Sequence, residues 1–228
     1  MRKKIRLGFY AILILFSLAI SLMLSVRATS DQTIGQGAVV MAQAQAEGLD
    51  PQVLQLGLKA YQHAKQMGLD KQNILTIIDY TKASTAPRLW VIDLNSGKIL
   101  FNTLVAHGKG SGSNYATQFS NKPGTEASSI GVYITGKAYW GEHGYSLRLF
   151  GEDKGFNDNA YARTIVMHPA WYVSQSFATA HGYLGRSWGC TALDEKVSRP
   201  IISAIKEGTV ILAYYPNQQW INSSTFLA

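Results

Sequence analysis

The chain has 228 residues, of which 46% are hydrophobic, the composition of a globular protein. Its formal net charge is +7, but five basic and no acidic residues stand within residues 1–28, leaving 16 basic against 14 acidic residues elsewhere. The remainder is nearly neutral and has no basic stripe, which excludes a nucleic-acid footprint as the reason for the charge. About 200 residues suffice for one substantial core, with or without a small helical extension.

The N-terminus has the order of an export signal. Four basic residues within residues 1–6 precede an apolar or small-residue run over 7–26, and residues 26–28 form a small-x-small cleavage sequence. The run is long for a signal and approaches a bilayer span. Residues 1–28 are therefore predicted to be a cleaved signal peptide or an N-terminal membrane anchor. Either would place the rest of the chain in the periplasm or another extracytoplasmic part of the cell envelope.

Two helices are predicted next, forming a helical hairpin extension over residues 29–72. The first spans residues 31–47 and stops at Gly48. The second begins with Asp50 as N-cap and Pro51 at the first helical position. Apolar residues then recur along one helical face, which we expect to cover an apolar surface: Leu54, Leu58, Tyr61 and Ala64.

From residue 73 onward the pattern predicts an α+β domain, residues 73–228, built on a mixed sandwich or barrel-like sheet. Asn95-Ser96-Gly97 marks a hairpin turn. Residues 108–125 are rich in glycine and polar residues, as in functional or mobile loops. Short helices are predicted at 173–180 and at 200–207, the latter with Pro200 near its start. Strands are predicted at residues 74–80, 88–94, 98–105, 130–135, 146–150, 164–167 and 209–215.

Cys190 is the single cysteine of a chain that carries an export signal. Exported proteins usually pair their cysteines as disulfides, so a lone thiol suggests a chemical role. It lies in a glycine-bracketed segment, residues 185–191, with Arg186 nearby. That setting is typical of an activated thiolate nucleophile. The alternative is a small buried hydrophobic residue.

A cysteine nucleophile needs a base, which folding rather than adjacency must supply. His168 follows a short apolar strand, and a strand end is a rigid mount for a base. His181 precedes the glycine-rich segment that leads to Cys190. His63 lies on a predicted helix and is expected to be solvated. His107 and His143 adjoin glycine-containing loops, and either could line a site without a clear mechanistic role.

Residues 165–168, ending in His168, are followed 22 positions later by Cys190 within Ser187-Trp188-Gly189-Cys190. This arrangement resembles the histidine and Ser-x-Gly-Cys signature of L,D-transpeptidase catalytic domains of the YkuD-like family, in a divergent branch. The resemblance runs from about residue 74 to 215. Further matching segments are residues 105–112, 119–125, 128–133 and 155–159.

Two positions depart from the commonest pattern of that family. Trp188 stands where many members have a second histidine, and Ala192 stands where many have an arginine. One substrate or oxyanion contact would then be supplied differently, and Arg186 is a candidate for it.

The resemblance implies peptidoglycan chemistry. Cys190 would attack the carbonyl of the third residue of a stem tetrapeptide, the terminal D-alanine would leave, and an amine of a neighbouring stem would accept the acyl group in a 3–3 cross-link. His168 would be the base. Backbone N–H groups around Ser187, Gly189 and Cys190 would hold the oxyanion. Ser187 would alternatively orient His168, bind substrate or cap the turn, Trp188 would form a pocket wall, and Arg186 and His181 would complete the substrate-binding set.

Three alternatives stay open or are disfavoured. An L,D-carboxypeptidase would share the acyl-enzyme and use water as acceptor. A non-catalytic peptidoglycan-binding protein would keep the fold alone. A papain-like peptidase is disfavoured because no histidine follows Cys190. The expected partner is the peptidoglycan stem peptide, and no nucleic acid is expected to bind. The protein is expected to be a monomer that contacts the membrane only through its N-terminal segment, if that segment is not cleaved. Neither metal nor cofactor is expected, since the histidines lack ligand spacing and the glycines at 108–112 lack the phosphate-loop pattern.

Overall fold

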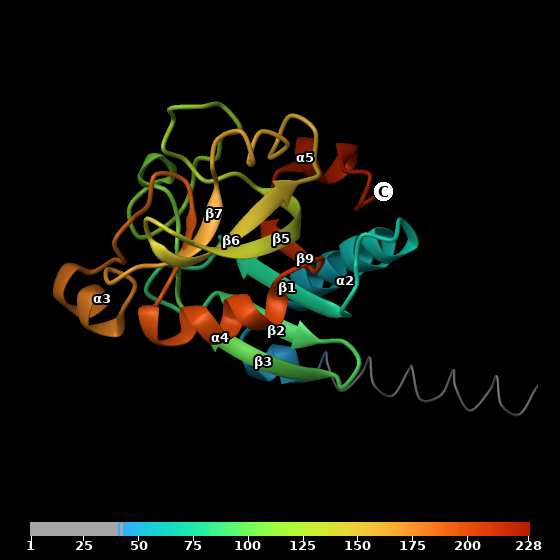
Figure 1. Ribbon diagram of the computed structural model, residues 1–228, viewed down its shortest axis with the longest axis horizontal. Coiled ribbons are helices and arrows are strands. Elements are labelled where there is room, and N and C mark those ends of the chain that lie inside the picture. Colours follow the sequence, from blue (N-terminus) through green and yellow to red (C-terminus); the bar gives the residue numbers. More distant parts are fainter. Residues whose placement is uncertain (1–40, 42) are drawn as a thin grey trace, which may run out of the picture. The chain divides into compact units, whose positions relative to one another are not determined.

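The computed structural model describes residue 41 and residues 43–228, which form one compact unit (Figure 1). The predicted signal or anchor at 1–28 and most of the helix predicted at 31–47 lie outside the described residues. Within the described part, every helix is too short or too polar to span a membrane.

A mixed sheet of nine strands organises the described residues. Its order is β3-β2-β1-β9-β5-β6-β7-β8-β4. The β1–β9 and β7–β8 pairs are parallel, and the other pairs are antiparallel. The strands are β1 (Ile74–Asp79), β2 (Leu89–Asp93), β3 (Lys98–Thr103), β4 (Val105–Ala106), β5 (Gly131–Gly141), β6 (Gly144–Gly151), β7 (Val166–Pro169), β8 (Thr191–Leu193) and β9 (Val210–Tyr214).

The sheet curls until its two edges meet, which confirms the predicted α+β class with a barrel-like sheet. The edge strands β3 and β4 are consecutive in the chain and are separated by Leu104 alone. Val91 of β2 and Val105 of β4, near opposite ends of the sheet order, pack into the same apolar core. The long strands β5 and β6 curve strongly in Figure 1. Curling lets one sheet enclose its own core on one face.

Arg88 crosses the seam between the two sheet edges. Its backbone N–H donates to the Thr103 carbonyl at 3.0 Å, and its guanidinium donates twice to the Val105 carbonyl, at 2.8 and 3.1 Å. The side chain is fully buried, so burial lowers its pKa to about 10. Because every donor in such a site must find a partner, Arg88 fixes the edge strands relative to each other.

Helix α2 (Pro51–Gln66) packs against β1 and β9, and its start follows the predicted signals. The Asp50 carboxylate accepts from the N–H groups of Gln52 and Val53, which confirms it as the N-cap. Gly57 permits the close approach of helix and sheet: a Cβ there would lie 2.7 Å from Cδ1 of Ile77. Three further helices follow, α3 (Gln175–His181), α4 (Glu195–Ile205) and α5 (Gln218–Ser223).

Several elements differ from the sequence prediction; strand β5, for example, runs to Gly141, whereas the predicted strand ended at residue 135. The strand predicted at 98–105 is broken at Leu104, where the chain passes from one sheet edge to the other. Strand β8 was not predicted, because three residues are too few to show a period. Helix α4 begins at Glu195 under the Asp194 cap, so Pro200 lies inside it and not near its start. Helix α5 was also not predicted; its cap is Asn217.

The glycine-rich segment 108–125 is tied to its surroundings. It contains a short 3-10 turn, η1 (Lys109–Ser111), and Gly110 donates from its N–H to the Glu126 carbonyl at 2.9 Å. The Ser111 hydroxyl accepts from the Ser128 N–H at 2.9 Å. These bonds tie the segment to residues 126–128.

Candidate active site

Cys190 and His168 come from neighbouring parallel strands. Cys190 immediately precedes β8, and His168 is the third residue of β7. The register pairs Met167 with Thr191 and His168 with Ala192. By the same register, Cys190 lies opposite Val166, which is two residues before His168 on β7. The strand pairing therefore brings together the two predicted catalytic residues.

Hydrogen bonds inside the turn at 187–190 fix the backbone before Cys190. The Ser187 hydroxyl donates to the Cys190 carbonyl at 2.7 Å and accepts from the Gly189 N–H at 3.1 Å. Ser187 therefore caps the turn, the third of the roles considered for it from the sequence. We call residues 187–190 the nucleophile turn.

Two other segments clamp the nucleophile turn from outside. The Ser187 N–H donates to the His107 carbonyl at 3.1 Å, and the Lys109 N–H donates to the Ser187 carbonyl at 2.8 Å. The Ser128 hydroxyl donates to the Gly189 carbonyl at 3.0 Å and accepts from the Gly108 N–H at 2.9 Å. Bonds from these two segments, together with those inside the turn, hold the backbone around Cys190 in one geometry.

Gly189 allows the turn to approach its neighbours. Its φ is +117°, in the region that favours glycine. A Cβ here would lie 2.9 Å from both the Ala127 carbonyl oxygen and Cδ1 of Ile165, and 3.3 Å from Nη2 of Arg163. A side chain at position 189 therefore has no room.

Arg163 lies beside Cys190 and was not singled out from the sequence. Its Nη1 donates to the Ser120 carbonyl at 2.6 Å and to the Ser129 hydroxyl at 2.7 Å, and Nη2 donates to the Ala127 carbonyl at 2.7 Å. These bonds hold a positive charge beside Cys190. The arginine that acts on the thiol is thus Arg163, whereas the sequence suggested Arg186.

The environment of Cys190 favours a resting thiol. Burial raises the pKa of the thiol, while the Val166 backbone and the Arg163 guanidinium act in the opposite direction. Sγ lies 3.8 Å from the Thr164 carbonyl oxygen. Within the described part of the chain, no hydrogen bond joins Cys190 to His168.

His168 is buried and has one nitrogen fixed. Its Nδ1 lies 2.9 Å from the Pro169 carbonyl oxygen, and because a carbonyl can only accept, Nδ1 carries the proton. Nε2 is therefore the basic nitrogen. Burial lowers the pKa of His168, nearby His143 lowers it further, and the Pro169 carbonyl opposes both. A neutral imidazole able to accept a proton is the favoured state at neutral pH.

His143 covers His168 from the turn between β5 and β6. The two ring centroids are 4.6 Å apart with the planes at 31°. From the sequence His143 had no clear role, since the turn and the strand are 25 positions apart. The hairpin carries this exposed histidine over the buried one.

Three other residues predicted for the site are Trp188, within the nucleophile turn, Arg186, just before it, and His181, at the end of α3. Trp188 is 78% exposed. Arg186 donates from Nη1 to the Gly112 carbonyl at 3.1 Å and lies over the Tyr183 ring, 5.1 Å from its centroid. His181 ends α3, where it stacks on Phe177 at 4.0 Å, and no contact links it to Cys190 in the described residues.

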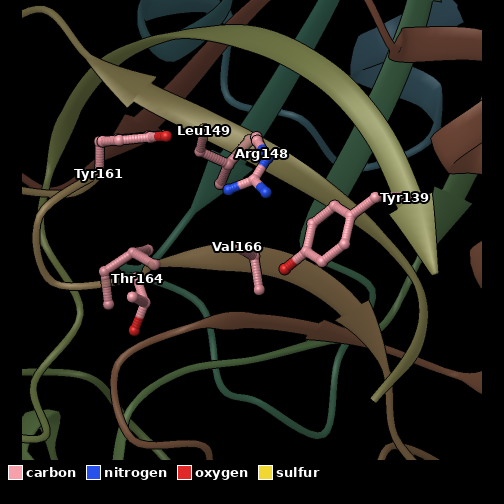
Figure 2. Close-up of a pocket in the computed structure, with 7 residues that line it drawn as sticks. Tyr139, Arg148, Leu149, Tyr161, Thr164 and Val166 are labelled. Atoms are coloured by element: carbon pink, nitrogen blue, oxygen red, sulfur yellow. The ribbon is translucent and has the colours of Figure 1, made fainter. Parts of the chain in front are cut away.

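A pocket of about 70 Å³ is formed by residues of β5, β6 and β7 and of the segment before β7 (Figure 2). Two of its lining residues also contact the thiol: the Thr164 carbonyl oxygen lies 3.8 Å from Sγ, and the Val166 backbone lowers the pKa of the thiol. The lining residues are Tyr139, Arg148, Leu149, Tyr161, Thr164, Ile165 and Val166. The arrangement offers a thiol, a neutral imidazole and a cationic pocket next to one another.

Comparisons with known proteins identify the family of this chain. A family model described as the L,D-transpeptidase catalytic domain matches residues 45–214. An L,D-transpeptidase from Mycobacterium smegmatis is 13% identical with a TM-score of 0.39, over 63% of this chain and 59% of that one. One from Mycobacterium tuberculosis H37Rv is 13% identical with a TM-score of 0.41, over 63% and 58%. One from Stackebrandtia nassauensis is 16% identical with a TM-score of 0.38, over 72% and 68%. The first two matches thus span less than two thirds of those chains. A comparison with curated proteins finds no match.

Proposed function

Because the chain belongs to the L,D-transpeptidase catalytic domain family, we propose that it exchanges peptide bonds between peptidoglycan stem peptides in the cell envelope. Cys190 attacks the carbonyl carbon of the third residue of a stem tetrapeptide. A thioester forms, the peptide C–N bond breaks, and the terminal D-alanine leaves as an amine. The amine of a second stem then attacks the thioester and releases the thiol, so one amide bond replaces another without a redox step.

His168 moves the protons in this scheme. Its Nε2 takes the thiol proton as Sγ turns away from the Thr164 carbonyl, and it returns that proton to the leaving amine. The Pro169 carbonyl keeps Nδ1 protonated, so Pro169 serves as the group that orients the base. A lowered pKa suits His168 to this role, because the imidazole must be neutral to accept a proton.

The tetrahedral oxyanion needs donors that point at it. The N–H groups of Ser187 and Gly189 already donate within the clamp of the nucleophile turn. We therefore assign the oxyanion to the Cys190 N–H, supported by the positive charge of Arg163. A preorganised donor of this kind is worth on the order of 10²-fold or more in rate.

The observation that carries the proposal is the placement of Cys190 on a clamped turn one strand away from a buried histidine of fixed tautomer. A carbapenem resembles the acyl donor and tests it directly. Residues 29–228 are incubated with the carbapenem and weighed intact by mass spectrometry, next to Cys190→Ala. A stoichiometric adduct on the parent alone supports the acyl-enzyme. No adduct on a folded parent favours the non-catalytic binding protein.

The acceptor decides between transpeptidase and L,D-carboxypeptidase. Both pass through the same thioester, so the chain's own residues do not separate them. Product analysis with a tetrapeptide, carried out with and without an added amine acceptor, separates the two activities. A 3–3 cross-linked dimer that grows with acceptor concentration supports the transpeptidase, and tripeptide with D-alanine alone supports the carboxypeptidase.

A further inference from the structure

The pocket beside Cys190 contains an arginine without an acidic partner. Cζ of Arg148 lies 4.5 Å from the ring centroid of Tyr139 and 5.9 Å from that of Tyr161. Figure 2 shows the guanidinium between these two rings. In the described part of the chain the ion pair found joins Lys109 to Glu126, so no carboxylate there neutralises Arg148. A ligand can supply that charge.

Neighbouring residues hold the two tyrosine rings in place. A Cβ at Gly141 would lie 2.7 Å from the Tyr139 ring, so the glycine leaves space for it. Phe150 stacks on Tyr161 with the centroids 5.1 Å apart and the planes at 15°. The guanidinium thus lies between two rings, each of which contacts a further residue of the chain.

The pocket and the thiol share one stretch of backbone. Thr164 is one of the residues that line the pocket, and its carbonyl oxygen is 3.8 Å from Sγ of Cys190. Val166 also lines the pocket, is paired with Arg148 in the sheet, and has its backbone against the thiol. Arg148 and the residue before β8, Cys190, therefore flank Val166 on the two sides of β7.

Size and charge define what fits. The pocket has a volume of about 70 Å³ and one cationic side chain in its lining, which suits a small anionic group. A guanidinium binds a carboxylate through two parallel hydrogen bonds. In a stem tetrapeptide, the leaving D-alanine carries a terminal carboxylate and a methyl group, and it directly follows the attacked carbonyl.

We infer that the pocket formed by Arg148, Tyr139 and Tyr161 binds the terminal carboxylate of the leaving residue. The inference rests on the proposed function for the identity of the peptide. It makes Arg148 a specificity-determining residue, because a stem that is amidated or extended at this end presents no carboxylate there.

Binding is measured without turnover by using Cys190→Ala as the parent protein. Calorimetric titration compares a stem tetrapeptide with the same peptide bearing a C-terminal amide. The free acid is expected to bind on the order of tenfold more tightly, since a charge-assisted hydrogen bond is lost in the amide. Adding Arg148→Gln should make the two affinities equal. Arg199→Gln is the matched control: this arginine also lies over an exposed ring, Trp140 at 6.0 Å, and its loss should leave the preference intact.

Three results overturn the inference: equal affinity of the parent for acid and amide, a preference that persists in Arg148→Gln, or failure of the parent to bind either peptide. Turnover by the protein with Cys190 intact reports separately on the proposed function. Acyl transfer without a carboxylate preference would support the proposed function and refute the proposed carboxylate pocket. A carboxylate preference that depends on Arg148, in a protein without acyl transfer, would support the carboxylate pocket and refute the proposed function.

Discussion

The exposed ring of His143 lies against the buried ring of His168, with the centroids 4.6 Å apart. Contact and charge both act on the base: burial lowers the pKa of His168, and a positive charge on His143 lowers it further. Because only the neutral imidazole accepts a proton, a lower pKa extends activity toward acidic pH.

We expect His143→Ala to raise the pKa of His168, since it removes both the cover and the charge. The acidic limb of the kcat/KM profile for acylation should move to higher pH, so activity falls more at acidic than at alkaline pH. His181→Ala is the control, because His181 ends α3 with no contact to Cys190 among the described residues. A limb that stays in place or moves to lower pH would contradict the coupling.

His168→Ala should slow acylation by about 10²- to 10⁴-fold, the usual contribution of a general base. The same substitution at His181 should leave the rate within about twofold of the parent. The measurement is the rate of carbapenem adduct formation, followed by intact mass. If His181→Ala is the more damaging change, the base has been assigned to the wrong histidine.

Cys190→Ala should abolish the adduct and all acyl transfer while leaving the fold intact. The side chain contacts the core but is only partly buried, and the turn is held by backbone and serine bonds that alanine preserves. We expect the melting temperature to stay within a few degrees of the parent, measured by circular dichroism. Acyl transfer retained by this variant would refute the mechanism.

Gly189→Ala should lower the free energy of unfolding by more than the cost of placing alanine at a positive φ alone. Gly155 offers a matched control: its φ is +84°, and a Cβ there meets nothing within 4 Å. A residue forced into a rare conformation costs on the order of 1–3 kcal/mol. Gly189→Ala adds contacts of 2.9 Å with Ala127 and Ile165. Denaturant unfolding of both variants measures the difference, and equal losses would show that the turn can move aside.

His107 should make stability depend on pH between about 4 and 6.5. The side chain is fully buried, its Nδ1 accepts from Nη2 of Arg88 at 2.8 Å, and its Nε2 finds no partner among the described residues. Burial, assisted by Arg88, lowers the pKa of His107 from 6.5 to about 4. The unfolded chain therefore binds more protons in this interval, so stability rises with pH and the gain is complete above about 6.5.

The shift corresponds to about 3 kcal/mol of unfolding free energy, lost as the pH falls toward 4. Unfolding in urea at a series of pH values measures it. His107→Gln removes the titrating group and should flatten this part of the profile whatever its overall cost. An unchanged slope in that variant would assign the pH dependence to other groups.

Local signals in the sequence predicted much of the scaffold. Asp50 and Pro51 start α2 as expected, and Asn95 to Gly97 turn between β2 and β3. The helix start and the turn depend on residues a few positions apart, where capping and turn geometry act directly. The predicted pair is further apart in the sequence: Cys190 immediately precedes β8, and His168 lies on the adjoining strand β7.

Contacts between distant segments were decided by the tertiary structure alone. Arg163 reaches Cys190 across 27 positions, His143 reaches His168 across 25, and Arg148 enters the pocket through the pairing of β6 with β7. A period or a cap does not encode which strands pair or how far a sheet curls. The sequence by itself pointed to Cys190 as the candidate nucleophile and predicted most of the elements around it. The closure of the sheet decided which charges surround it, because side chains far apart in the chain meet only once the strands are paired.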